Sequence, residues 1–140
     1  MIVSGYISDN VKITKVKDHS TAGTSTVESD EIDMLGYDGV LFVTSFGTPA
    51  TNNIATVEHG AVSGTVAASV ALKTSGSSDE EVLVDVQHPI FRYVRLSVAR
   101  GTSSTLESIY AIQYKGRSLP EDNSVTGTIA VGQFNAPASA

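Results

Sequence analysis

Two neighbouring stretches decide the fold: Val82-Leu-Val-Asp-Val86 and Phe91-Arg-Tyr-Val-Arg-Leu-Ser-Val-Ala-Arg100. In the first, three valines alternate with Leu83 and Asp85. In the second, apolar residues again occupy every second position, at Val94, Leu96 and Val98. Alternation with a period of two is the pattern of a β-strand that buries one face. We therefore predict two strands, with these apolar residues facing inward.

The same pattern recurs along the chain. Thr, Val, Ser, Ala and Gly dominate the composition, and no long stretch has a helical repeat. Further strands are predicted at Ile2–Ile7, Val11–Val16, Thr24–Val27, Ile32–Leu35, Val40–Phe46, Ile54–Glu58, Val66–Leu72 and Leu106–Lys115. A flat sheet this large tends to split into two packed layers. The sequence predicts an all-β fold, a jelly roll or related antiparallel β-sandwich of about eight strands.

The pattern changes near the C-terminus. We predict a β-sandwich domain over residues 1–118 and an extended C-terminal arm over residues 119–140. The large apolar residues of this arm are too few for a core of its own; they are Val125, Ile129, Val131 and Phe134. We expect the arm to lie on a partner or to add a strand to a neighbour's sheet. The alternative is a frayed terminus.

Composition limits the partners. The 140 residues include no cysteine, which excludes disulfides and thiolate metal sites. The net charge is -6, so we expect neither a nucleic-acid partner nor binding to an anionic membrane. No apolar run approaches the roughly 20 residues that span a bilayer, and residues 1–20 lack the features of a secretory signal. We expect a protein that is made and used without entering a secretory pathway.

The residues that could carry catalysis are scattered. His19, His59 and His88 lack metal-ligand spacing, and their pattern favours turn residues or hydrogen-bonding groups. The acidic clusters Glu28–Asp33 and Asp79–Glu81 have the pattern of solvated strand ends and turns. Nucleophile-elbow and phosphate-binding motifs are absent from the sequence. We predict no catalytic, cofactor or metal site.

One charged strand invites a more specific hypothesis. If Val82–Val86 and Phe91–Arg100 form a hairpin, Asp85 lies opposite Tyr93 and diagonal to Arg95. Asp85 and Arg95 then form either a surface ion pair of small energetic value or part of a polar platform that docks on a partner. In the second interpretation Tyr93 and Arg95 are the anchors.

Three longer segments of the sequence are Ile32-Asp-Met-Leu-Gly-Tyr-Asp-Gly-Val-Leu-Phe-Val43, Asp85-Val-Gln-His-Pro-Ile-Phe-Arg-Tyr-Val-Arg-Leu-Ser-Val-Ala-Arg-Gly101 and Ala111-Ile-Gln-Tyr-Lys-Gly-Arg-Ser-Leu-Pro120. They resemble the decoration, or cement, proteins of tailed-bacteriophage heads. The small-residue C-terminal tail is also similar. The resemblance implies a non-enzymatic structural protein, made in the host cytoplasm, that binds the outside of the virion capsid and bridges neighbouring subunits of the major capsid protein.

The resemblance also implies a homo-oligomer. A dimer is our first expectation because two-fold assemblies are the commonest, and a trimer is the rival. The sequence leaves two alternatives to the function of a cement protein. One is a carbohydrate- or receptor-binding β-sandwich module of a virion, against which the absence of tryptophan counts. The other is a hydrolase built on a jelly roll.

Overall fold

The computed structural model describes residues 5–48, 50, 52–73, 81–101, 103–124 and 129–133, with backbone alone over 68–73. Within this part the chain forms one single-turn helix and a series of short strands. They are α1 (Ile7–Asn10), β1 (Val11–Lys17), β2 (Ser20–Gly23), β3 (Val27–Glu28), β4 (Ile32–Asp33), β5 (Gly39–Ser45), β6 (Ile54–Gly60), β7 (Ala67–Lys73), β8 (Glu81–Gln87), β9 (Tyr93–Ala99), β10 (Ser104–Leu106) and β11 (Ile109–Tyr114). No helix among the described residues has the length and apolar character to cross a lipid bilayer.

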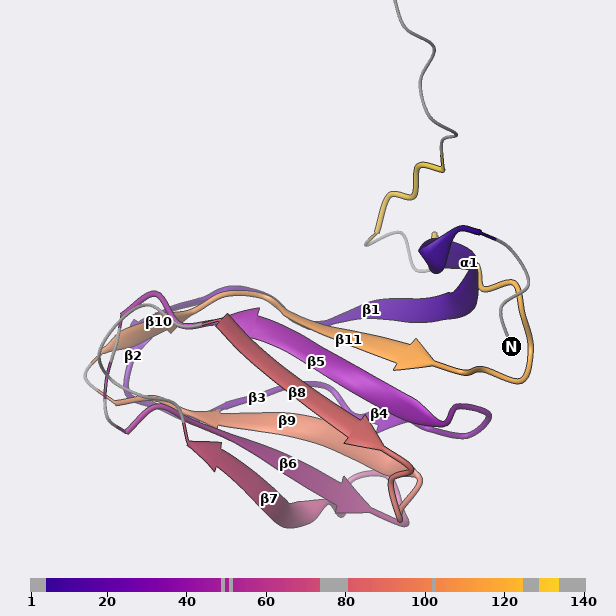
Figure 1. The fold of residues 1–140 in the computed structure, drawn as a ribbon. Helices are drawn as coiled ribbons and strands as arrows, with labels where there is room; N and C mark the ends of the chain where they lie inside the picture. The colour runs from indigo at the N-terminus through magenta and orange to yellow at the C-terminus, as the bar shows by residue number, and fades with distance from the viewer. Residues whose placement is uncertain are drawn as a thin grey trace, which may run out of the picture.

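The strands build two packed antiparallel layers (Figure 1). Sheet 1 has four strands in the order β1-β11-β5-β8. Sheet 2 has five, in the order β3-β9-β6-β7, with β4 also paired to β9. If β3 and β4 are counted as one interrupted strand, this is the strand order of a jelly roll, to which β2 and β10 add a small separate pair. The predicted all-β sandwich is confirmed.

The core lies between the inner faces of the two sheets. Val94, Leu96 and Val98 of β9 are completely buried, and Val82 of β8 is nearly so. Leu83 and Asp85 point to the other side of β8, as the alternation predicted. Completely or nearly completely buried residues from sheet 1 meet those from sheet 2; they include Val40, Phe42, Ala55, Ile109 and Ala111. Burial of these apolar side chains is the main stabilising contribution.

Arg100 closes one end of the sandwich. Its guanidinium donates to the carbonyl oxygens of Thr21 (2.7 Å), Ser25 (2.9 Å) and Ser104 (2.9 Å), and to Ser25 Oγ (3.1 Å). Arg100 is buried, so these acceptors replace the water that its charge would otherwise bind. The planar fork of donors thereby joins β2, the loop after it and β10.

Three local predictions are wrong. Gly5 and Tyr6 are not in a strand, and Ile7–Asn10 is helix α1; the rest of Ile2–Ile7 lies outside the described residues. The segment predicted as one strand from Leu106 to Lys115 contains the end of β10 and, after a break, β11. The predicted hairpin of β8 and β9 does not form, because β8 pairs with β5 in sheet 1 while β9 pairs with β6 in sheet 2. Both strands bury valines in the same core, but from opposite layers.

The segment after β11 returns to the N-terminal end of the molecule. The Asn123 side chain accepts a hydrogen bond from the Ile13 amide (2.6 Å) and donates to the carbonyl oxygens of Ser8 (2.8 Å) and Val11 (2.9 Å). Gln133 reaches the same place, donating to Ser8 Oγ at 2.8 Å. Residues 119–124 therefore lie against α1 and β1. The division of the chain at residue 118 stays a prediction.

Candidate interaction surfaces

Arg95 and Tyr93 lie on the outer face of sheet 2. Arg95 Nε donates to Glu58 Oε1 at 2.8 Å, and Arg95 Nη2 is 3.2 Å from Glu28 Oε1. The Arg95 side chain is only 23% exposed and that of Glu58 is 16% exposed. The positive charge of Arg95 is therefore balanced by carboxylates of the same sheet. Tyr93 is half-buried on the same face. Their role as anchors for a partner stays a prediction, but Arg95 already has two carboxylate partners in its own chain.

A second ion pair lies beside Tyr93. Arg92 donates from Nε and Nη2 to the two carboxylate oxygens of Asp33, both at 2.8 Å, and its guanidinium carbon is 5.2 Å from the centre of the Tyr93 ring. The hydrogen bond from Arg92 is the main cause that holds the pKa of Asp33 below its ordinary value. The outer face of sheet 2 thus carries paired charges around Tyr93 and Arg95.

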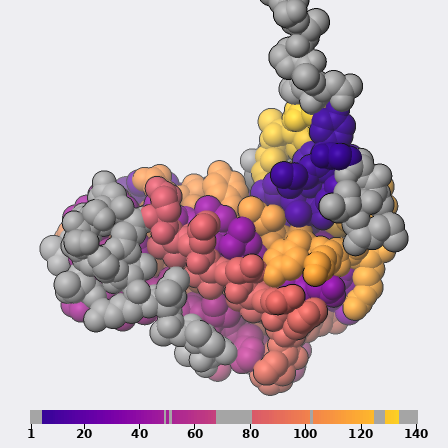
Figure 2. Space-filling view, viewed as in Figure 1, coloured from indigo at the N-terminus to yellow at the C-terminus, as the bar shows by residue number. Residues whose placement is uncertain are grey.

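The outer face of sheet 1 is different in character. Two cross-strand rows follow from the register of its four strands: Ile13–Ile112–Leu41–Asp85 and Lys15–Tyr110–Val43–Leu83. We call the six apolar residues of these rows the sheet 1 patch; they are Ile13, Leu41, Val43, Leu83, Tyr110 and Ile112. All six are at least partly accessible, and Leu83 is 61% and Tyr110 38% exposed. In Figure 2 the residues of β8, in salmon, run diagonally across the visible face. Adjacent exposed apolar residues of this kind are typical of a surface that binds another protein.

Asp85 belongs to this outer face, not to the neighbourhood of Arg95. Its Oδ1 accepts a hydrogen bond from the Tyr114 hydroxyl at 2.6 Å. The Tyr114 ring lies over Gly39, where an added Cβ would collide with it, so glycine at this position lets the ring cross the strand. Burial, and then the hydrogen bond to Asp85, raise the pKa of Tyr114 to about 12. The predicted contact between Asp85 and Arg95 is wrong because their strands lie in different sheets.

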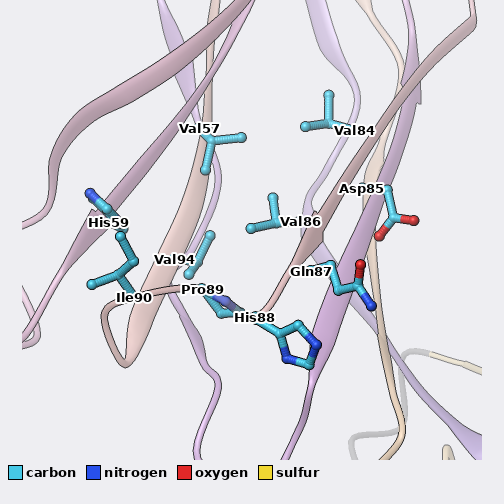
Figure 3. A pocket seen from close by; sticks show the side chains of 10 residues that line it. All are labelled: Val57, His59, Val84, Asp85, Val86, Gln87, His88, Pro89, Ile90 and Val94. Carbon is cyan, nitrogen blue, oxygen red and sulfur yellow. The ribbon is translucent and has the colours of Figure 1, made fainter.

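An apolar pocket of about 360 Å³ opens between the two sheets beside β8. Figure 3 shows Val84 and Val86 of β8 on one side, with Val57 of β6 and Val94 of β9 facing them. His59 and His88 line opposite parts of the rim, and the Asp85 carboxylate is turned away from the valines. The interior of the pocket therefore presents aliphatic surface.

The three histidines occupy separate places. His19 Nδ1 is 3.3 Å from Glu107 Oε2, and the His59 ring packs edge-on against Phe91 with centroids 4.6 Å apart. His88 has a positive φ of 51° in the turn between β8 and β9. Across the described ranges, no three His, Asp or Glu side chains form a group that could hold a metal ion.

The candidate residues of the arm are only partly visible. Ile129 is half-buried and Val131 is 41% exposed, whereas Val125 and Phe134 lie outside the described residues. The candidates on β9 and those in the arm come from different parts of the fold, since Tyr93 and Arg95 lie in sheet 2 and the arm follows sheet 1. The role of the arm in binding stays a prediction.

Sequence reasoning missed the sheet 1 patch, although its signal was present. Tyr110, Ile112 and Tyr114 share one parity of β11, and Ile109, Ala111 and Gln113 share the other. The second set is the buried one, although it includes the small Ala111 and the polar Gln113. Only the pairing of β11 between β1 and β5 shows that the larger side chains form a continuous outer surface.

Comparisons with known proteins add little to this description. No protein-family model matches the chain, and no curated protein matches it significantly. A solved structure from work on Bacillus endospore appendages, a family of disulfide-linked pili, is similar over 75% of this chain and 88% of that chain, with 16% identity and a TM-score of 0.40. A similarity at this level carries no argument about function, which has to be inferred from the two sheet faces and the pocket.

Proposed function

We propose that this chain is a structural binding protein that sits on the outer surface of an assembled capsid and bridges neighbouring subunits of the major capsid protein. The observation that carries the proposal is the sheet 1 patch, in which exposed Tyr110 and Leu83 flank Val43 in a row of apolar side chains across β11, β5 and β8. A rigid sheet face presents such side chains in fixed positions, which suits binding to a regular lattice of subunits.

Two further features support this proposal. The quoted segments resemble capsid decoration proteins, and all three contribute residues to sheet 1, in β5, at the end of β8 and in β11. The segment that follows β11 leaves the sandwich beside β1, at the border of the same sheet. A protein that contacts one subunit through a sheet face and another through a terminal segment gains avidity from the two contacts.

The first test is decoration of shells assembled from the major capsid protein encoded in the same genome. The intact protein is expected to co-sediment with the shells and to raise their disruption temperature. Tyr110→Asp places a charge in the sheet 1 patch and should abolish most of the binding. Thr56→Asp is the matched control, because Thr56 lies on the outer face of sheet 2. This variant should decorate shells as well as the intact protein does. Equal binding by both variants would remove the patch from the proposal.

The second test concerns the arm. Removal of residues 125–140 leaves Asn123 in place, which matters because Asn123 is buried against β1. The truncated protein is expected to remain folded by circular dichroism and to bind shells more weakly. Undiminished decoration would show that the arm does not anchor the protein. If the intact protein does not bind shells but binds sugars on a glycan array, the carbohydrate-binding alternative replaces this proposal.

A further inference from the structure

The outer edge of β8 is built as a regular strand. β8 pairs with β5 over seven consecutive residues, from Gly39 with Gln87 to Ser45 with Glu81, with no shift in register. Its sequence, Glu-Val-Leu-Val-Asp-Val-Gln, contains neither proline nor lysine, and its two charged residues, Glu81 and Asp85, share the outer face of the strand. Within the described part of the chain, no strand pairs with the other side of β8. The edge can therefore accept another strand.

The apolar pocket lies next to this edge. Val84 and Val86 of β8 form one wall, and Val57 and His59 of β6 form the facing wall (Figure 3). A strand added to β8 in the plane of sheet 1 would point every second side chain toward sheet 2. Those side chains would extend the apolar layer beside the pocket. Both the backbone of β8 and the pocket thus fit a strand with apolar residues at alternate positions.

We propose that this strand is β8 of a second copy of the chain. Antiparallel pairing about a two-fold axis at Val84 would join the two four-stranded sheets into one continuous sheet. On the inner face, Val84 would meet Val84 of the second copy, and Val82 would meet its Val86. Pairs of β-branched residues directly opposite each other stabilise antiparallel strands. A two-fold interface has to be self-complementary, and the alternation of β8 satisfies this on the inner face.

The charges of β8 select this register among its neighbours. With the axis at Val84, Asp85 lies opposite Leu83 of the second copy, and Glu81 lies opposite Gln87. A shift that moves the axis to Leu83 would put Glu81 opposite Asp85 at two symmetric positions. A shift to Asp85 would put the two copies of that carboxylate directly against each other. Like charges in opposite positions destabilise a strand pair, so both neighbouring registers are disfavoured.

Shifts by a single residue are excluded by the faces of the strand. Such a shift would place the inward valines of one copy opposite the outward residues of the other. The register at Val84 also brings Leu83, 61% exposed in the single chain, diagonal to Leu83 of the second copy. The pairing would therefore cover part of the most exposed side chain of the sheet 1 patch. The inference concerns the protein in solution and does not depend on capsid binding.

Introduced cysteines test the register, because the chain has no cysteine of its own. In Val84→Cys the two thiols would be directly opposite, with Cβ atoms about 4.5–5.5 Å apart, and mild oxidation should yield a covalent dimer. In Leu83→Cys, the matched control, the thiols would be diagonal, about 7–8 Å apart, and little dimer should form. Efficient cross-linking at position 83, or at neither position, would overturn the proposed pairing.

Charge substitutions at Leu83 give an independent test by sedimentation equilibrium. Leu83→Lys would face Asp85 of the second copy and should tighten the wild-type dimer, by about tenfold for two symmetric pairs. Leu83→Asp would face the same carboxylate and should weaken the dimer by about tenfold. Because Leu83 is exposed, both variants should fold, and circular dichroism checks this. A monomeric wild-type protein, a trimer, or equal effects of the two substitutions would contradict the inference.

Discussion

The two edges of sheet 1 satisfy their backbone groups in different ways. At β1 the register with β11 shifts between Lys15 and Lys17, and the amide of Ile13 donates to the side chain of Asn123. At β8 the register with β5 is unbroken. One edge is therefore irregular and capped by a segment from the far end of the chain, while the other keeps the form of a strand ready to pair.

This difference leaves β8, and not β1, as the edge of sheet 1 with the regular register that strand pairing needs. An uncovered strand edge is a risk of unwanted pairing, and proteins usually interrupt or charge it. In this chain the lysines and the irregular register are on β1, and the alternating valines are on β8. If the β8 edge pairs with a second copy, the protection of β1 leaves one direction in which sheet 1 can grow. The dimer would then present two sheet 1 patches side by side.

The largest effect should come from removing the cap of β1. Asn123 is only 3% exposed, and its side chain makes three hydrogen bonds to the backbone of residues 8–13. Asn123→Ala leaves the Ile13 amide without its acceptor and should reduce the free energy of unfolding by about 2–3 kcal/mol. Urea unfolding followed by circular dichroism measures this loss. Asn52→Ala, at an exposed turn, is the control and should cost less than about 0.5 kcal/mol. Similar losses in both variants would mean that the cap is not what holds this edge.

A smaller effect should come from two tyrosines, one near each edge. The Tyr37 hydroxyl donates to Glu121 Oε1 at 2.7 Å in the segment that covers β1, and Tyr114 donates to Asp85 on β8. Burial and then the acceptor carboxylate raise the pKa of both hydroxyls, that of Tyr114 to about 12. An unfolded tyrosine ionises near pH ~10, so this stabilisation is complete below that pH and is lost as the pH rises toward the folded pKa values.

The measurement is the stability of the wild-type protein and its variants at several pH values above neutrality. The wild type should lose stability between about pH 10 and 12. Tyr37→Phe and Tyr114→Phe should each cost about 1 kcal/mol at neutral pH and make the alkaline loss less steep. Tyr110→Phe serves as the control, since no hydrogen bond of its hydroxyl is found among described residues. An alkaline loss that is unchanged in both variants would contradict the assignment.

The smallest effect is expected at a lysine of β1. Lys12 Nζ donates to the Asp122 carbonyl oxygen at 3.1 Å on an exposed part of the edge. Lys12→Ala should change the free energy of unfolding by less than about 0.5 kcal/mol, because water can replace an exposed hydrogen bond. A loss as large as that of Asn123→Ala would show that the lysine, and not the buried amide, fastens the C-terminal segment to β1.

Sequence alternation determined the strands and the faces they bury. Val82, Val94, Leu96 and Val98 were predicted to face inward and are fully or almost fully buried. A period of two follows from the local geometry of an extended chain, so it can be read without knowledge of the partners. The number of strands and the absence of a long helical repeat were sufficient for the prediction of a layered all-β fold.

Only the tertiary structure decided which strands became neighbours. Alternation shows that one face is buried but not against which layer, and the proposed pairing of β8 with β9 was wrong for this reason. Asn123 lies in a polar break that resembled a simple loop. Its side chain nevertheless accepts a hydrogen bond from the amide of Ile13, 110 positions away in the sequence. The continuity of the sheet 1 patch and the free edge of β8 also arise from contacts between distant segments. Such contacts depend on how the whole chain minimises exposed apolar surface and unpaired backbone groups, which no local stretch of sequence records.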